Sequence, residues 1–172
     1  MGLFGKVFEK KQCSICGGDI GLLGNRKLED GNMCKECAAK LSPFFSDRRN
    51  STVADIEQQL DYREKNKEVV RKFHTTRTIG ENMKLLLDED AKKFIVTRAR
   101  NLEEANPDVI SFSDVTGVDF KIDEDKSEEK REDKDGNRVS YNPPKYIFEY
   151  DFHITIHVNN PYFDTISCQL NP

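Results

Sequence analysis

Four cysteines near the start of the chain form a regular array. Cys13 and Cys16 are separated by two residues, Cys34 and Cys37 repeat that spacing, and 17 residues lie between the two pairs. This C-x2-C-x17-C-x2-C spacing is typical of structural zinc modules, whereas a single C-x2-C pair would also fit a redox motif. The array therefore predicts one Zn²⁺ ion held by Cys13, Cys16, Cys34 and Cys37.

Two disulfides are the alternative use of four cysteines, and they are the first choice in a small secreted domain. The first eight residues are too short an apolar stretch for the core of a signal peptide, because Glu9, Lys10 and Lys11 follow at once. Neither cysteine pair lies beside a βαβ pattern, where a redox pair is expected. We therefore expect a cytoplasmic protein with reduced thiols and bound zinc.

The residues around the cysteines fit a small zinc-binding fold. Residues 17–18 are both glycine, which suits a knuckle that turns backbone N–H groups toward sulfur. We expect a small hairpin from residues 20–23 and 27–29, a tight turn at residues 30–32 and a helix around residues 38–41. These parts indicate a zinc-ribbon or treble-clef unit.

The metal is expected to be structural. About forty residues bury too little apolar surface to fold alone, whereas structural zinc contributes roughly 10 to 16 kcal/mol. A catalytic zinc keeps one coordination position open, and four cysteines close the shell. No motif for a nucleophile with its base, and no phosphate loop, stands out elsewhere. The chain is therefore expected to be non-enzymatic.

Charge is distributed unevenly and bears on the choice of partner. Residues 1–50 carry nine Lys or Arg and six Asp or Glu, whereas residues 80–172 carry twelve and twenty. When four thiols lose their protons and bind one Zn²⁺, the net charge falls by two, so the first module keeps little of its excess of positive charge. Nucleic-acid binding is therefore a second hypothesis after protein interaction, and it depends on Arg26, Lys27, Arg48 and Arg49.

One long helix is predicted over residues 52–73. Thr52 and Asp55 have the spacing of a capping box, and Val53, Ile56 and Leu60 follow at helical intervals. The centre of the segment is mostly charged. We expect a charged connector with a narrow apolar edge.

Alternating apolar residues after Thr78 predict an antiparallel β-domain. Strands are expected at residues 83–87, 93–97, 109–115, 117–122, 146–158 and 163–170. The strand at 146–158 alternates most regularly, which predicts one face in the core and one in water. Thirteen residues at 123–135 include twelve charged ones, and they are expected to form a mobile loop or a solvated hairpin tip that could contact a basic partner.

Three segments of the β-domain carry a resemblance. LLLD at residues 85–88 with FIV at 94–96, followed by VISFSDVTG at 109–117, resembles the opening strands of bacterial pleckstrin-homology-like domains. Together with CSICGGDIGLL at 13–23 and the segment 40–49, nearly the whole chain is similar to an uncharacterised family of bacterial proteins of unknown function. The resemblance implies a pleckstrin-like barrel, with an open sheet as the alternative. By analogy alone, it implies a protein-interaction or scaffold role at a membrane surface.

The expected fold is α+β with three parts. They are a zinc-binding module at residues 1–45, a charged helical connector at 46–78 and a pleckstrin-like antiparallel β-domain at 79–172. The expected partner is another protein, with a membrane surface and nucleic acid as alternatives.

Two histidines, the fifth cysteine and the apolar residues near the N-terminus are not expected to bind a metal or to be catalytic. His153 and His157 lie four apart on a predicted strand, about 13 Å, which is too far to clamp one ion, so both are expected at the surface. Cys168 lies on an apolar strand face and is expected in the core. Residues 3–8 could form an apolar helical edge that packs on the zinc module or contacts a membrane or partner.

Overall fold

The computed structural model describes residues 11–171, and the apolar edge expected at residues 3–8 lies outside this range. The chain begins with two small antiparallel sheets: β1 (Lys11–Gln12) pairs with β2 (Asp19–Ile20), and β3 (Arg26–Lys27) pairs with β4 (Asn32–Met33). The short helix α1 (Lys35–Ala38) follows. We call residues 11–41 the four-cysteine unit.

The expected hairpin between residues 20–23 and 27–29 is wrong. The hairpin instead joins β3 to β4 through the turn at residues 28–31, whose ends are tied by a bond from Leu28 N to Gly31 O of 2.9 Å. The expected turn at residues 30–32 lies at this point.

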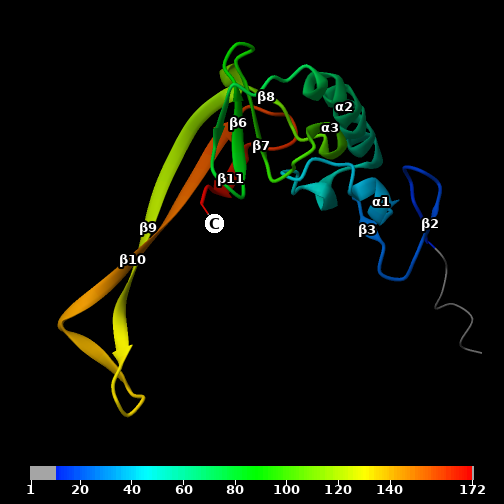
Figure 1. The fold of residues 1–172 in the computed structure, drawn as a ribbon. Helices are drawn as coiled ribbons and strands as arrows, with labels where there is room; N and C mark the ends of the chain where they lie inside the picture. The colour runs from blue at the N-terminus through cyan, green and yellow to red at the C-terminus, as the bar shows by residue number, and fades with distance from the viewer. Residues whose placement is uncertain (1–10, 172) are drawn as a thin grey trace, which may run out of the picture.

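The long helix is α2 (Val53–Arg71), preceded by the 3-10 turn η1 (Arg48–Asn50). Thr52 and Asp55 form the predicted capping box, with Asp55 N donating to Thr52 Oγ1 and Thr52 N donating to Asp55 Oδ2. The helix lies across the four-cysteine unit (Figure 1). Among the described residues, no helix combines the length and the apolarity needed to cross a bilayer.

Two antiparallel sheets make up the second half of the chain. The first has the order β5 (Arg77–Ile79), β6 (Lys84–Asp88), β7 (Lys93–Thr97) and β8 (Ile110–Ser111), with α3 (Leu102–Ala105) between the last two. The second has the order β11 (Thr165–Gln169), β10 (Arg138–Val158) and β9 (Val115–Glu132). The described strands form no closed barrel. Open sheets are therefore observed in place of the pleckstrin-like barrel.

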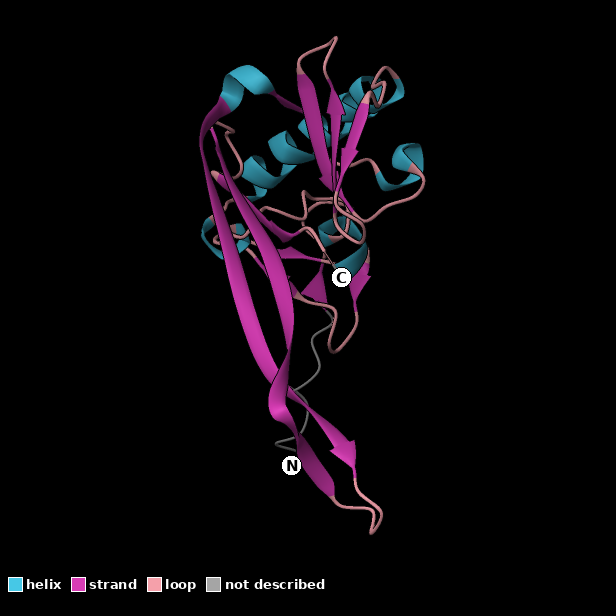
Figure 2. Ribbon diagram, turned by 60° about the vertical axis from the view of Figure 1, so that its left-hand side comes forward, coloured by secondary structure: helices cyan, strands magenta, loops and turns pink. Residues whose placement is uncertain are grey.

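The β9–β10 hairpin is the longest feature of the fold and extends well beyond the remainder of the molecule (Figure 2). The register pairs Ile156 with Val118 at its base and Arg138 with Glu132 near its tip. Four residues, 141–144, bulge from β10 between two paired segments. They include two prolines, which cannot donate to a strand ladder.

Two predictions about this region need correction. Residues 123–135 were expected to form a mobile loop or a solvated hairpin tip; residues 123–132 instead pair with β10 along their whole length, and only residues 133–137 form the tip. Residues 109–115 are not one strand, because the 3-10 turn η2 (Phe112–Asp114) separates β8 from β9. The side chain of Ser111 accepts a bond from Ser113 N and so caps this turn.

The core consists of two clusters of buried residues. One belongs to the four-cysteine unit and includes Ile56 of α2. The other lies between the two larger sheets, where Phe94 and Ile110 meet Ile156 and Ile166.

A buried polar network lies along α2 between these clusters. Arg63 Nη1 donates to Asp108 Oδ1 at 2.7 Å, and Ser42 Oγ donates to Asp108 Oδ2 at 2.7 Å. Asn66 Nδ2 donates to the carbonyl oxygen of Pro107 at 2.7 Å. The network therefore joins α2, the segment directly after the four-cysteine unit and the loop that leads to β8.

Candidate metal centre

The structure brings the four predicted ligands together. One sulfur atom from each of Cys13, Cys16, Cys34 and Cys37 lies within 4.8 Å of the other three. The sulfur atoms of Cys16 and Cys34 are 3.8 Å apart. A tetrahedral zinc site with Zn–S bonds of about 2.3 Å places its sulfur atoms about 3.8 Å from one another. The arrangement therefore fits a metal ion of this size.

The first pair lies in a tight knuckle after β1. Cys13 N donates to Gly18 O at 2.8 Å, and Gly17 N donates to Cys13 O at 2.8 Å. Gly17 has a φ of 72°, which residues with a side chain rarely adopt. Ser14 N donates to Asn32 O at 2.7 Å and so holds the knuckle against β4.

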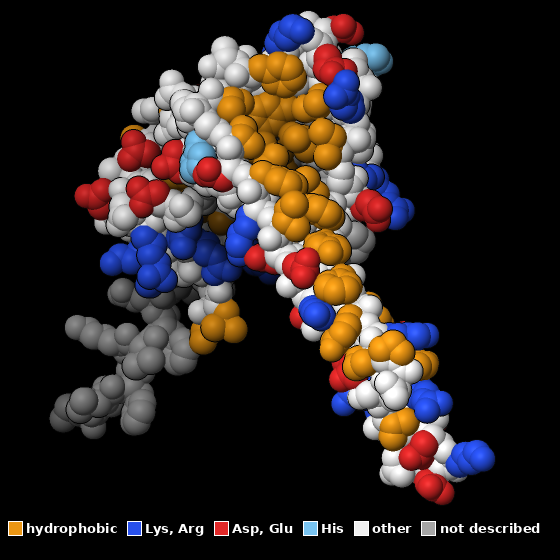
Figure 3. All heavy atoms as spheres, turned by 90° about the vertical axis from the view of Figure 1, so that its left-hand side faces the viewer, with side chains coloured by type: hydrophobic (Ala, Val, Ile, Leu, Met, Phe, Trp, Pro, Cys, Tyr) orange, Lys and Arg blue, Asp and Glu red, His pale blue; other side chains and the backbone are white. Residues whose placement is uncertain are grey.

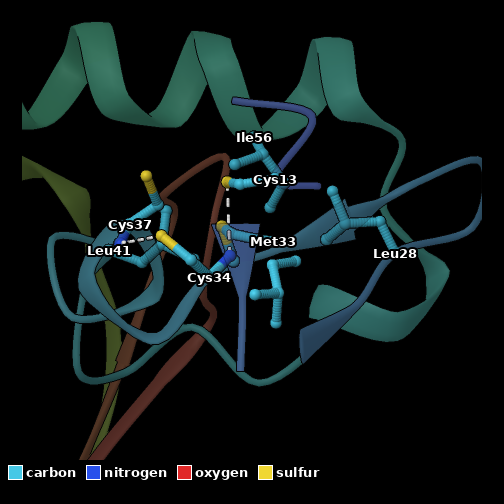
Figure 4. Close-up of a cluster of buried hydrophobic side chains, with 8 residues drawn as sticks. Cys13, Leu28, Met33, Cys34, Cys37, Leu41 and Ile56 are labelled. Atoms are coloured by element: carbon cyan, nitrogen blue, oxygen red, sulfur yellow. Dashed lines mark hydrogen bonds between the residues drawn. The ribbon is translucent and has the colours of Figure 1, made fainter. Parts of the chain in front are cut away.

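The second pair lies at the start of α1. Cys34 is the N-cap of the helix, and its sulfur accepts a bond from Cys37 N at 3.3 Å. Cys34 N in turn donates to the sulfur of Cys13 at 3.2 Å, which links the two pairs (Figure 4). Such N–H groups stabilise negative charge on sulfur, which is the form that binds a metal.

Burial and hydrogen bonding shift the pKa values of the Cys13 and Cys37 thiols in opposite directions. Burial raises the pKa of Cys13, but bonds from the backbone of Cys16, Cys34 and Ile15 outweigh it and lower this pKa to about 6. Burial raises the pKa of the Cys37 thiol, and the neighbouring thiols raise it further. A divalent cation favours the thiolate form at every ligand, so we expect metal binding to release protons.

The sulfur cluster lies inside the first core. Cys13, Cys34 and Cys37 are buried, whereas Cys16 is exposed. Leu28 and Met33 are fully buried beside them, and Ile56 of α2 covers the cluster from above (Figure 4). A change in the arrangement of the cysteine ligands would therefore also disturb the packing of α2 against the four-cysteine unit.

The comparisons with known proteins bear on this unit alone. A family described as a domain of unknown function (DUF4428) matches residues 11–59, which cover the four-cysteine unit and the first turns of α2. No curated protein and no solved structure matches the chain significantly. The match agrees with the resemblance to a family of unknown function for the four-cysteine unit only, since it does not extend to the β-domain.

The four basic residues of the nucleic-acid hypothesis also come together. Arg26 and Lys27 of β3 and Arg48 and Arg49 of η1 line one hollow of about 760 Å³. Arg48 Nη1 donates to Lys27 O at 2.6 Å and so holds η1 against β3.

The two histidines on β10 do not converge. His157 Nε2 lies 2.8 Å from Asp119 Oδ2, and His153 Nε2 lies 3.6 Å from Asp123 Oδ2, so each has its own carboxylate. Cys168 of β11 is partly buried and packs against the second core cluster, and burial raises its pKa.

Sequence reasoning missed two features. One is the Arg63–Asp108 pair, whose side chains are 7% and 0% exposed. The spacing of Gln59, Arg63 and Asn66, which continues the buried positions between Ile56 and Val70, indicates that Arg63 is buried, but it does not indicate Asp108 as the partner. The other is a row of exposed apolar side chains on the β9–β10 hairpin.

Proposed function

We propose that this chain is a non-enzymatic, zinc-stabilised protein-interaction module that presents the β9–β10 hairpin to a second protein. In this proposal one zinc ion, bound by the four cysteines, has a structural role. The single observation that carries the proposal is the exposed apolar surface of the hairpin.

That surface, which we call the apolar stripe, consists of six half-exposed side chains: Val118, Phe120, Ile122, Tyr146, Phe148 and Tyr150. They share one face, because alternate residues of a strand point to the same side and the register places Phe120 opposite Ile154 and Ile122 opposite Phe152. At Ile156 this face packs into the second core cluster, and farther along the hairpin the same face is exposed. Figure 3 shows it as a row of hydrophobic side chains.

The size of the stripe supports a partner. Aromatic side chains have surfaces of about 150 to 250 Å² each, so the six half-exposed residues present on the order of 500 Å². Patches of this size lie at the upper end of what monomeric proteins expose and are often functional. At the base of the stripe, Phe120 and Phe152 line a shallow hollow of about 290 Å³ that could receive a partner side chain.

The charge of the hairpin favours a protein over nucleic acid or an anionic membrane at this site. Residues 115–158 contain eleven Asp or Glu and seven Lys or Arg. A polyanion would be repelled by this excess, whereas a protein surface with apolar and basic side chains would match it.

Site-specific photo-crosslinking in the cells that make the protein tests the proposal. A benzoyl-phenylalanine at position 148 lies on the stripe, and the same group at position 149 lies on the opposite face of the same strand. We expect position 148 to form a crosslink to one discrete protein and position 149 to form none. A product of twice the chain mass would identify a second copy as the partner. The same group at position 120, also on the stripe, provides a second probe. Equal labelling from both faces would contradict the proposal, and so would the absence of a crosslink from both position 148 and position 120.

A further inference from the structure

The turn between β2 and β3 exposes two leucines. Leu22 and Leu23 are 83% and 91% exposed, and a bond from Gly24 N to Gly21 O of 2.9 Å closes the turn that carries them. The flanking residues Ile20 and Leu28 already supply the apolar side chains that enter the core. Packing of the four-cysteine unit therefore does not explain why two adjacent, exposed residues of this turn are leucine.

The basic hollow lies beside this turn. Arg26 Nη1 lies 3.4 Å from the carbonyl oxygen of Leu23, so the first cation of the hollow contacts the turn itself. Lys and Arg side chains gather on this part of the molecule next to a small hydrophobic projection (Figure 3).

The cations of the hollow have no carboxylate partner among the residues that the structure describes. Within residues 11–171, none of Arg26, Lys27, Arg48 and Arg49 forms an ion pair with a carboxylate. Partial burial, together with repulsion from Arg26 and Arg49, lowers the pKa of Arg48. A bound anion would relieve this repulsion, and Glu29 is the one acidic residue among the described residues that line the hollow.

We propose that this side of the four-cysteine unit docks on an anionic phospholipid bilayer, with Leu22 and Leu23 entering the interface and the four cations contacting lipid phosphates. Adjacent cations and projecting apolar side chains are the combination that binds such a surface. Nucleic acid fits less well, because the described residues that line the hollow include no aromatic side chain for base stacking and leucines contribute nothing to phosphate contacts. This site is separate from the apolar stripe, so the two proposals fail or succeed independently.

Vesicle flotation with the full-length, zinc-loaded chain tests the docking. Vesicles of phosphatidylcholine alone are compared with vesicles rich in phosphatidylserine. We expect binding only to the second kind, weakened about tenfold by Leu22→Ser with Leu23→Ser. Each lost cation should weaken binding about fivefold, so Arg26→Gln with Arg49→Gln should lower it by about 25-fold. Lys121→Gln with Lys130→Gln removes the same charge from the β9–β10 hairpin and should leave binding unchanged.

A second measurement does not depend on loss of binding. The chain contains no tryptophan, so Leu22→Trp introduces a single tryptophan, which can be excited apart from the five tyrosines, at an exposed position. Its emission should shift to shorter wavelength with phosphatidylserine vesicles and stay unchanged with phosphatidylcholine vesicles.

Three results would overturn the docking proposal. They are an unshifted emission, equal flotation with both kinds of vesicle, and binding to a duplex or single-stranded oligonucleotide that Leu22→Ser with Leu23→Ser leaves intact. The last result would assign the hollow to nucleic acid. Unchanged zinc content and thermal stability of each variant would exclude misfolding as the cause of lost binding.

Discussion

Asp88 shows how a single carboxylate joins three segments of the chain. It lies at the end of β6 and is buried, and its Oδ2 accepts a bond from His74 N at 2.9 Å. Its Oδ1 accepts a bond from Ala91 N at 2.9 Å. These two bonds lower the pKa of Asp88, because they favour the charged form.

The lowered pKa predicts the pH dependence of stability at this residue. Since the folded pKa lies below the unfolded value of about 3.9, the contribution of Asp88 is present above that value and is lost as pH falls through the folded pKa. Asp88→Asn should therefore lower the melting temperature at pH 7, and the difference from the wild type should shrink below about pH 4. Loss of metal in acid affects both proteins alike and cancels in this comparison.

Asp90→Asn is the matched control for this experiment, because Asp90 is exposed two residues along the same turn. It should change the melting temperature little at either pH. A difference between Asp88→Asn and the wild type that persists undiminished in acid would contradict this account of the carboxylate.

At the scale of elements, α2 separates what the sequence can predict from what it cannot. Its start and its capping box follow from Thr52 and Asp55, because both partners are local. Its buried polar residues depend on partners 40 or more positions away, since Arg63 contacts Asp108 and Asn66 contacts Asn106. No local pattern specifies such contacts, so the helix was expected to be a connector and its packing was missed.

Breaking the buried pair tests the role of α2. Arg63→Met leaves Asp108 buried without its cation, which should cost about 3 to 5 kcal/mol in the free energy of unfolding. Arg71→Met, on the same helix, removes an exposed cation that contacts Glu68 and should cost less than about 1 kcal/mol. Urea unfolding monitored by circular dichroism measures both values. Similar losses for the two variants would show that the network does not hold the helix.

The β9–β10 hairpin shows a second limit of sequence reasoning. Charged residues at 123–132 have low strand propensity, and the expectation of a loop or a hairpin tip followed from that composition. Pairing with the alternating residues of β10 overrides this preference, because each added pair extends a ladder that is already formed. The alternation of apolar and polar residues predicted which side chains of β10 share a face. It did not predict that this face is exposed along the hairpin, since burial depends on the tertiary arrangement.

At the scale of the whole molecule, the four-cysteine unit and the open sheets share one framework through α2. Ile56 belongs to the first core cluster, and Tyr62 packs against Tyr162 of the second half with ring centroids 5.1 Å apart. Phe44, which follows the four-cysteine unit, packs against Phe163 with centroids 5.4 Å apart. Loss of the metal should therefore loosen α2 and its contacts with the sheets as well as the cysteine ligands.

Zinc content measured together with thermal unfolding tests the central claim most directly. The purified chain should contain one zinc ion, and a chelator should remove it while lowering the melting temperature. Cys13→Ser should lose the zinc and unfold earlier, whereas Cys168→Ser, outside the cluster, should keep the full zinc content. A chain that contains no metal, has its four cysteines oxidised to disulfides and melts at the same temperature with chelator would contradict the account.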